Sequence, residues 1–123
     1  MDTIEEAETI GPIIKPDVMV IAPCTGNTLA KIASGIFDTP VTLGAKAHLR
    51  NMKPLIIALA TNDALSLNFK NIAELYQRKN VYFVPLMQDD PINKPSSLVC
   101  DFALLPEAIE AAIDHRQLLP LFR

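Results

Sequence analysis

Three short runs of apolar residues divide the chain at intervals. They cover residues 17–23, 54–60 and 81–85. None of them alternates apolar with polar positions, and a short continuous apolar run is typical of a strand that is covered on both faces, as in a parallel sheet. The pattern therefore predicts three buried strands.

Apolar residues between these runs recur with helical spacing. In residues 27–37, Leu29, Ile32 and Ile36 follow one helical stripe. A second helix is expected over residues 39–50, because Thr39 suits a cap and the proline after it suits the first helical position. The remaining stretches are two helices, at residues 68–79 and from 106 onward, a polar loop at 88–95, an extended tail at 118–123, and an unassigned segment at 96–105.

Alternating strands and helices predict right-handed βαβ crossovers around a parallel sheet. We therefore expect residues 1–123 to form a single α/β domain with a flavodoxin- or Rossmann-like three-layer fold. Three strands make a small sheet, and the first of them is expected to expose an edge. Either an oligomer covers that edge, or the first βα units of the fold are missing at the amino end.

Composition narrows the classes of function. Half of the residues are hydrophobic and the net charge is −3, which supports a packed core and gives no reason to expect nucleic-acid binding. No apolar stretch is long enough to cross a membrane, and the acidic start is not a secretory signal. Two widely spaced cysteines favour free thiols over a disulfide or a metal site. We expect a cytoplasmic protein without metal.

Candidate chemistry lies in the loops that follow the strands, because open α/β sheets bind ligands outside the carboxyl ends of their strands. In the first loop, Gly26 lets backbone approach a ligand, while Thr25, Asn27 and Thr28 place polar groups beside free helix amides. This arrangement suits a phosphate, a carboxylate or the polar rim of a planar ring. A plain helix cap by Thr25 or Asn27 explains the same residues equally well.

The other two loops offer weaker signals. Thr61, Asn62 and Asp63 are placed to hydrogen-bond a substrate, although a capped turn is the simpler interpretation. Residues 88–90 are expected to form a solvated acidic turn. Lys31 is the cation nearest the first loop and a candidate for binding an anionic group, and Asp63 is the one carboxylate that we would test as catalytic.

Residues 17–33 resemble the third strand–loop–helix unit of the flavoprotein superfamily of FMN-dependent decarboxylases and flavin prenyltransferases, and Gly35 and Asp38 continue the pattern. In that superfamily a proline, small polar residues and an Asn-Thr or Lys-Thr pair contact FMN. The prenyltransferase branch has an arginine where this chain has Thr61, which argues against prenyl transfer. The resemblance implies the following FMN-binding residues: Pro23, Thr25, Gly26, Asn27, Thr28 and Thr61, with Lys31 and Asn62 binding substrate.

Four stretches resemble one branch of the superfamily most closely: residues 21–27, 45–51, 61–65, and 82–85 with 88–89. That branch is an oxidoreductase of sporulating bacteria, which oxidises a dihydro precursor from the lysine pathway to pyridine-2,6-dicarboxylate. The resemblance implies a second subunit that carries NADP, a homo-oligomer, and relatives that are longer at the amino end. Two other interpretations stay open: a non-catalytic assembly subunit, and an FMN-binding flavoprotein of another reaction.

Overall fold

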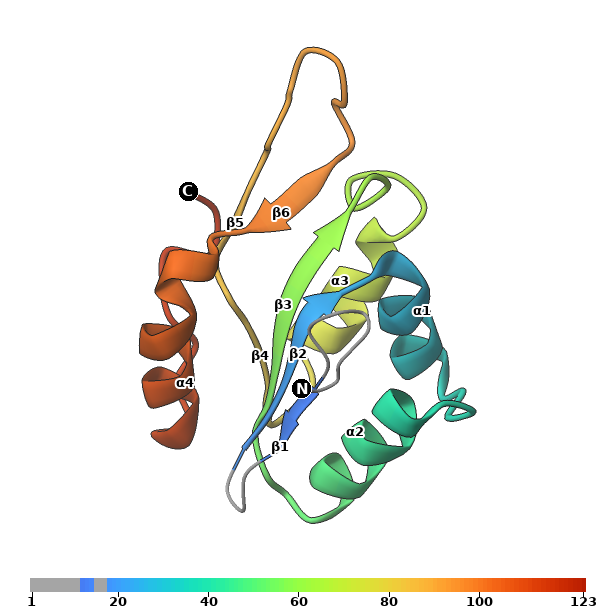
Figure 1. Cartoon of the computed structure of the whole chain (residues 1–123), viewed down its shortest axis with the longest axis vertical. Coiled ribbons are helices and arrows are strands. Elements are labelled where there is room, and N and C mark those ends of the chain that lie inside the picture. The colour runs from blue at the N-terminus through green and yellow to red at the C-terminus, as the bar shows by residue number, and fades with distance from the viewer. Residues whose placement is uncertain (1–11, 15–17) are drawn as a thin grey trace.

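The computed structural model describes residues 12–14 and 18–123. Helices α1, α2 and α3 lie on one side of a central sheet and α4 on the other, which gives the predicted three layers (Figure 1). No helix in the described part of the chain is long and apolar enough to span a membrane. The elements are β1 (Pro12–Ile14), β2 (Met19–Cys24), α1 (Gly26–Ser34), α2 (Pro40–Arg50), β3 (Leu55–Thr61), α3 (Phe69–Tyr76), β4 (Val81–Phe83), β5 (Leu86–Met87), β6 (Leu98–Cys100), the 3₁₀ helix η1 (Phe102–Leu104) and α4 (Leu105–Ile113).

The three predicted strands form the parallel centre of the sheet. Strand β3 pairs in parallel with β2 on one side and with β4 on the other. Residues 55–59 of β3 are fully buried, as are Met19 and Val20 of β2. Burial on both faces explains why these runs are apolar at every position, and the flavodoxin-like α/β class predicted from them is confirmed.

Three short strands make the sheet mixed. Strand β1 runs antiparallel to β2, so the chain itself covers the edge that the sequence predicted to be exposed; that prediction was wrong. Strand β6 pairs antiparallel with the carboxyl end of β3, beyond the point where β4 stops. The acidic start of the chain, which we distinguished from a secretory signal, lies outside the described residues.

The carboxyl-terminal third is built around a projecting hairpin. Strands β5 and β6 pair antiparallel, and the predicted loop at residues 88–95 lies at the tip of this arm (Figure 1). The unassigned segment 96–105 supplies β6, η1 and the start of α4. The tail runs beside β5, where the Leu86 amide donates to the Leu121 carbonyl at 2.7 Å and the Arg123 amide donates to the Leu86 carbonyl at 2.9 Å.

Helix ends follow the predicted chemistry. Thr39 and Thr42 form a reciprocal capping box at the start of α2, with Pro40 as its first residue. Helix α1 ends at Gly35, whose φ of 75° is left-handed and suits glycine. Helix α3 is shorter than the predicted 68–79, because the helical hydrogen bonding ends near Tyr76 and the chain turns at Asn80 with φ of 71°.

Gln117 closes the outer edge of β4. Its side-chain oxygen accepts from the Phe83 amide at 2.8 Å, and its side-chain nitrogen donates to the Phe83 carbonyl at 2.6 Å. We expect Gln117→Ala to lower the free energy of unfolding by about 2 kcal/mol, because both backbone groups of a buried residue lose their partner. Thermal unfolding measures this as a midpoint about 8 °C lower.

The matched control is Gln77→Ala, since the Gln77 side chain is exposed and makes one long contact, 3.4 Å, with Glu74. Its unfolding free energy is expected to stay within about 0.5 kcal/mol of the parent. Equal midpoints for the two variants would show that Gln117 contributes nothing as an edge cap.

Candidate functional site

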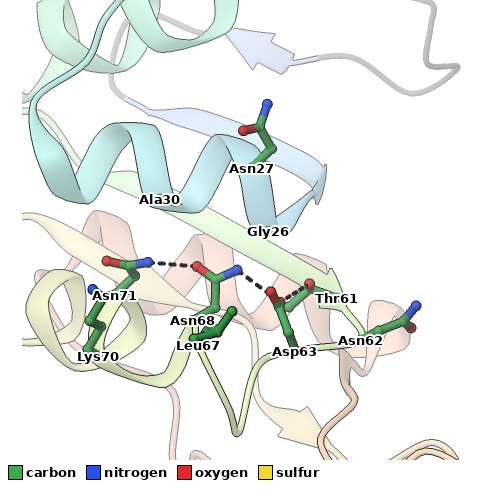
Figure 2. Close-up of a pocket in the computed structure, with 10 residues that line it drawn as sticks. All are labelled: Gly26, Asn27, Ala30, Thr61, Asn62, Asp63, Leu67, Asn68, Lys70 and Asn71. Carbon is green, nitrogen blue, oxygen red and sulfur yellow. Dashed lines mark hydrogen bonds between the residues drawn. The ribbon is translucent and has the colours of Figure 1, made fainter.

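The carboxyl ends of β2 and β3 lie side by side, since Cys24 is in register with Leu59. The loops that follow these strands therefore open at one edge of the sheet, as expected for the fold. A pocket of about 720 Å³ lies between them, and Figure 2 shows its lining side chains. The lining consists of Gly26, Asn27, Ala30, Thr61, Asn62, Asp63, Leu67, Asn68, Lys70 and Asn71.

Four side chains along this pocket form one hydrogen-bonded row, which we call the Asp63 network (Figure 2). Thr61 Oγ1 donates to Asp63 Oδ1 at 2.7 Å, and Asn68 Nδ2 donates to the same oxygen at 2.9 Å. Asn71 Nδ2 then donates to Asn68 Oδ1 at 2.7 Å. Because Asn68 is only 6% exposed, the row is anchored in the protein at its centre.

Backbone hydrogen bonds also hold the loop at residues 63–68 in place. The amides of Ser66 and Asn68 both donate to the Asp63 carbonyl at 3.1 Å. These bonds fold residues 63–68 back toward the end of β3. Asn68 thereby reaches Asp63 across five positions of the chain, which places the start of α3 against the carboxyl end of β3.

Asp63 is an ionised acceptor in this setting. The hydrogen bond from Asn68, followed by the one from Thr61, holds the pKa of its carboxyl below the usual value, while partial burial opposes the shift. A carboxylate with a low pKa and two donors on one oxygen is a weak proton acceptor at neutral pH. The geometry therefore suits Asp63 to positioning its neighbours.

Gly26 lies against the Asp63 network. A Cβ atom at this position would stand 2.6 Å from Thr61 Oγ1 and 2.7 Å from Asn68 Nδ2, closer than heavy atoms pack. The sequence predicted that Gly26 permits a close approach of backbone to a ligand. The structure adds a second reason for glycine, since its missing side chain leaves room for the network beneath α1.

Helix α1 presents free donors at this edge. Thr25 caps it as the simpler interpretation proposed: its Oγ1 accepts from the Thr28 amide at 3.2 Å and its carbonyl accepts from the Leu29 amide at 3.0 Å. Within the described residues, nothing accepts a hydrogen bond from the amides of Gly26 and Asn27. A helix start with two free amides attracts carbonyl oxygens and anions.

Five of the residues predicted from the sequence are brought together in this pocket, namely Gly26, Asn27, Thr61, Asn62 and Asp63. Thr25 lines an adjoining pocket of about 350 Å³, together with Asp89 and Ser97 of the hairpin arm. Asp89 accepts a hydrogen bond from Ser97, which is the largest cause of the lowered pKa of its carboxyl. The predicted acidic turn therefore borders the second pocket.

The other predicted residues lie outside both linings. Pro23 is an exposed residue of β2, and Thr28 is half-buried on α1. Lys31 Nζ pairs with Asp38 Oδ1 at 3.0 Å and does not line the pocket. The cation that does line it is Lys70, which sequence reasoning missed although it follows the loop after β3.

Cys24 is fully buried at the end of β2. Burial raises the pKa of its thiol to about 12, and Cys100 adds to the shift. A thiol with so high a pKa is a packing group without nucleophilic character at neutral pH.

Comparison with known proteins agrees with this geometry. The family model described as Flavoprotein matches residues 2–114. The chain is 47% identical over 121 residues to the B subunit of dipicolinate synthase from Bacillus subtilis (strain 168), which covers 98% of this chain and 60% of that relative. It is 33% identical over 82 residues to the flavin prenyltransferase UbiX of Thermoplasma acidophilum, covering 67% of this chain and 44% of the prenyltransferase.

A solved structure supports the same relationship. The crystal structure of the dipicolinate synthase B subunit from Bacillus halodurans matches with a TM-score of 0.86 at 51% identity, over 87% of this chain and 55% of that one. The resemblance predicted from four stretches of sequence is thereby confirmed. The chain spans about 60% of the length of the Bacillus subtilis relative.

Proposed function

The chain belongs to the Flavoprotein family, and from that premise we propose that it acts as the B subunit of a dipicolinate synthase. The reaction removes two hydrogen atoms, as a hydride and a proton, from a dihydrodipicolinate-type precursor to leave pyridine-2,6-dicarboxylate. The observation that carries the proposal is the row of polar side chains beside the two free amides of α1, at the carboxyl ends of β2 and β3. The similarity to the B subunit of the Bacillus subtilis synthase selects this reaction.

FMN fits the donor set of this pocket. The amides of Gly26 and Asn27, with the side chain of Asn27, match the carbonyl oxygens and ring nitrogens along one edge of an isoalloxazine ring. A volume of about 720 Å³ is in the range of small-molecule sites. Bound flavin would supply a hydride acceptor. The residues of this chain bind and orient the ring edge.

The carboxylates of the substrate need donors and a positive charge. Lys70 lines the pocket, whereas Lys31 is engaged with Asp38, so we assign the cationic contact to Lys70. Asn62 follows β3 directly and orients the ring of the substrate. The Asp63 network holds Thr61 and Asn68 in place beneath these contacts.

The reaction would need an electron acceptor beyond this chain. The Bacillus subtilis relative is a B subunit by name, which supports a companion A subunit. We propose that this A subunit carries NADP, that the chain forms a homo-oligomer, and that the assembly works in the cytoplasm during sporulation.

FMN retention tests the proposal. Wild-type chain mixed with FMN is expected to carry the yellow chromophore through a sizing column. Asn27→Ala is expected to bind FMN about tenfold more weakly, because a donor to the ring edge is lost. Asn93→Ala is the matched control, since Asn93 is exposed and, among the described residues, bonds to Asp90 alone in the hairpin loop. Complete loss of flavin from the wild type contradicts the cofactor assignment.

One observation favours a non-catalytic assembly role instead. Only two titratable side chains, Asp63 and Lys70, line the pocket among the described residues. In that case synthase activity measured with the A subunit would require this chain and yet stay unchanged in Asn27→Ala. An equal loss of flavin binding and of activity in that variant supports the catalytic interpretation.

A further inference from the structure

A separate pocket of about 440 Å³ lies at the opposite end of the sheet. It is lined by Met52, Lys79, Asn80, Tyr82 and His115. The Leu55 amide, at the first residue of β3, donates to the Asn80 carbonyl at 2.7 Å. The site described above begins at Thr61, the last residue of the same strand. A seven-residue strand, roughly 20 Å long, separates the two pockets, so they are distinct sites.

Asn80 supplies the strongest indication of a ligand. This residue is 5% exposed and lines the pocket. Its backbone carbonyl has a partner, but no described residue makes a hydrogen bond with its side-chain carboxamide. A buried amide without a partner is unfavourable and uncommon in folded proteins. A polar group entering the pocket would satisfy it.

The backbone conformation around the pocket also indicates a ligand-binding site. In the described part of the chain, the non-glycine residues with positive φ are Met52 at 61°, Asn80 at 71° and His115 at 58°, and all three line this pocket. Met52 and His115 follow the ends of α2 and α4, where glycine is the usual residue. Left-handed residues that keep their side chains cluster at functional sites.

The lining defines the chemistry of the ligand. Lys79 brings a positive charge, and Asn80, Tyr82 and His115 bring N–H or O–H donors. Burial raises the pKa of the Tyr82 hydroxyl, which therefore remains a donor at neutral pH. No carboxylate lines the pocket among the described residues. These groups suit an anion.

Acidic groups nearby do not cancel this charge. Asp114 precedes His115 in the chain, but its carboxylate pairs with Arg116 at 3.6 Å and does not line the pocket. The Met52 side chain and the Tyr82 ring add apolar surface to the lining. An organic anion with an apolar body is the class that uses both parts.

We propose that this pocket binds a small organic anion through a carboxylate or phosphate group, with Asn80 as its buried hydrogen-bond donor and Lys79 as its counter-charge. The assignment is independent of the flavin pocket. It gives the amino ends of the strands a ligand-binding role of their own.

Titration of the whole chain, followed by nuclear magnetic resonance, tests the proposal. The probes are benzoate, inorganic phosphate, and benzamide as the neutral analogue of benzoate. Saturable shifts in the signals of Asn80, Tyr82 and His115 are expected with one or both anions and not with benzamide. Saturation by benzoate alone assigns a carboxylate ligand, and saturation by phosphate alone assigns a phosphate. Saturation by neither anion overturns the proposal, as does equal saturation by benzamide.

Three variants locate the binding. Asn80→Gly keeps the left-handed backbone while removing the carboxamide, and is expected to bind the anion about tenfold more weakly. Lys79→Gln is expected to lose about threefold. Lys94→Gln, in the exposed hairpin loop, is the matched control and is expected to bind like wild type. Wild-type affinity for the anion in both pocket variants overturns the assignment. If Asn80→Gly fails to fold, the affinity of Lys79→Gln and the response to benzamide still test whether this pocket binds an anion.

Discussion

Alanine in place of Gly26 is expected to weaken FMN binding by about a hundredfold while the chain stays folded. The new methyl group would stand 2.6 Å from Thr61 Oγ1 and 2.7 Å from Asn68 Nδ2, so those side chains or the start of α1 must move. Both atoms donate to Asp63, and the residue that would clash with them, Gly26, carries one of the two free amides of α1. Losing about three hydrogen bonds of about 1 kcal/mol each gives this factor.

Gly35, just beyond the other end of α1, provides the matched control. Nothing lies within 4 Å of a Cβ at this position, and its φ of 75° is strained for alanine. Gly35→Ala should therefore lower the free energy of unfolding by about 1 kcal/mol and keep wild-type flavin affinity. Flavin fluorescence titration and thermal unfolding of both variants separate the two effects. Undiminished affinity in Gly26→Ala would place the flavin away from the Asp63 network.

The strands that sequence patterning found are those buried on both faces. The apolar runs at residues 17–23, 54–60 and 81–85 contain β2, β3 and β4, because a parallel strand that is covered on both faces tolerates few polar residues. Strands β1, β5 and β6 have only two or three residues each, too few for any period to show, whereas the equally short β4 could be predicted because its apolar run extends to residue 85. They form because a neighbouring strand offers unpaired backbone groups. That pairing depends on tertiary contacts, which a local sequence pattern does not contain.

The candidate site divides in a similar way. Thr61 and Asp63 could be predicted because they follow a strand, and the fold brings the strand ends together. Asn68 and Asn71 could not, because their contacts depend on how the loop after β3 folds back. The spacing of residues in the sequence does not predict how residues 63–68 fold back after β3.

The geometry of α1 explains why Lys70 lines the pocket and the predicted Lys31 does not. Helix α1 turns Asn27 and Ala30 toward the pocket, three positions apart on one face. Gly26 and Ala30, four positions apart, centre the face of α1 that lines the pocket, and Lys31 lies about 100° round the helix from Ala30, where Asp38 is its partner. Lys70 reaches the pocket from α3, which packs against α1.

Asp63→Asn is expected to retain synthase activity within about threefold, and Asp63→Leu to lose about a hundredfold or more. An asparagine oxygen still accepts from Thr61 and Asn68, so the network survives, whereas leucine leaves both donors unpaired. The measurement is kcat over a range of pH in the presence of the A subunit, together with FMN affinity.

The two roles of Asp63 predict opposite results for the asparagine variant. A general base contributes roughly a hundredfold to ten-thousandfold to the rate, so its conversion to an amide would remove activity while leaving flavin affinity intact. A positioning acceptor instead loses activity and flavin affinity together, and only in the leucine variant. Asp38→Asn, which breaks the ion pair with Lys31 outside the pocket, controls for the loss of one surface charge. Because the hydrogen bonds from Asn68 and Thr61 already hold the pKa of Asp63 low, positioning is the role that the geometry favours, and an inactive Asp63→Asn that still binds FMN would reverse it.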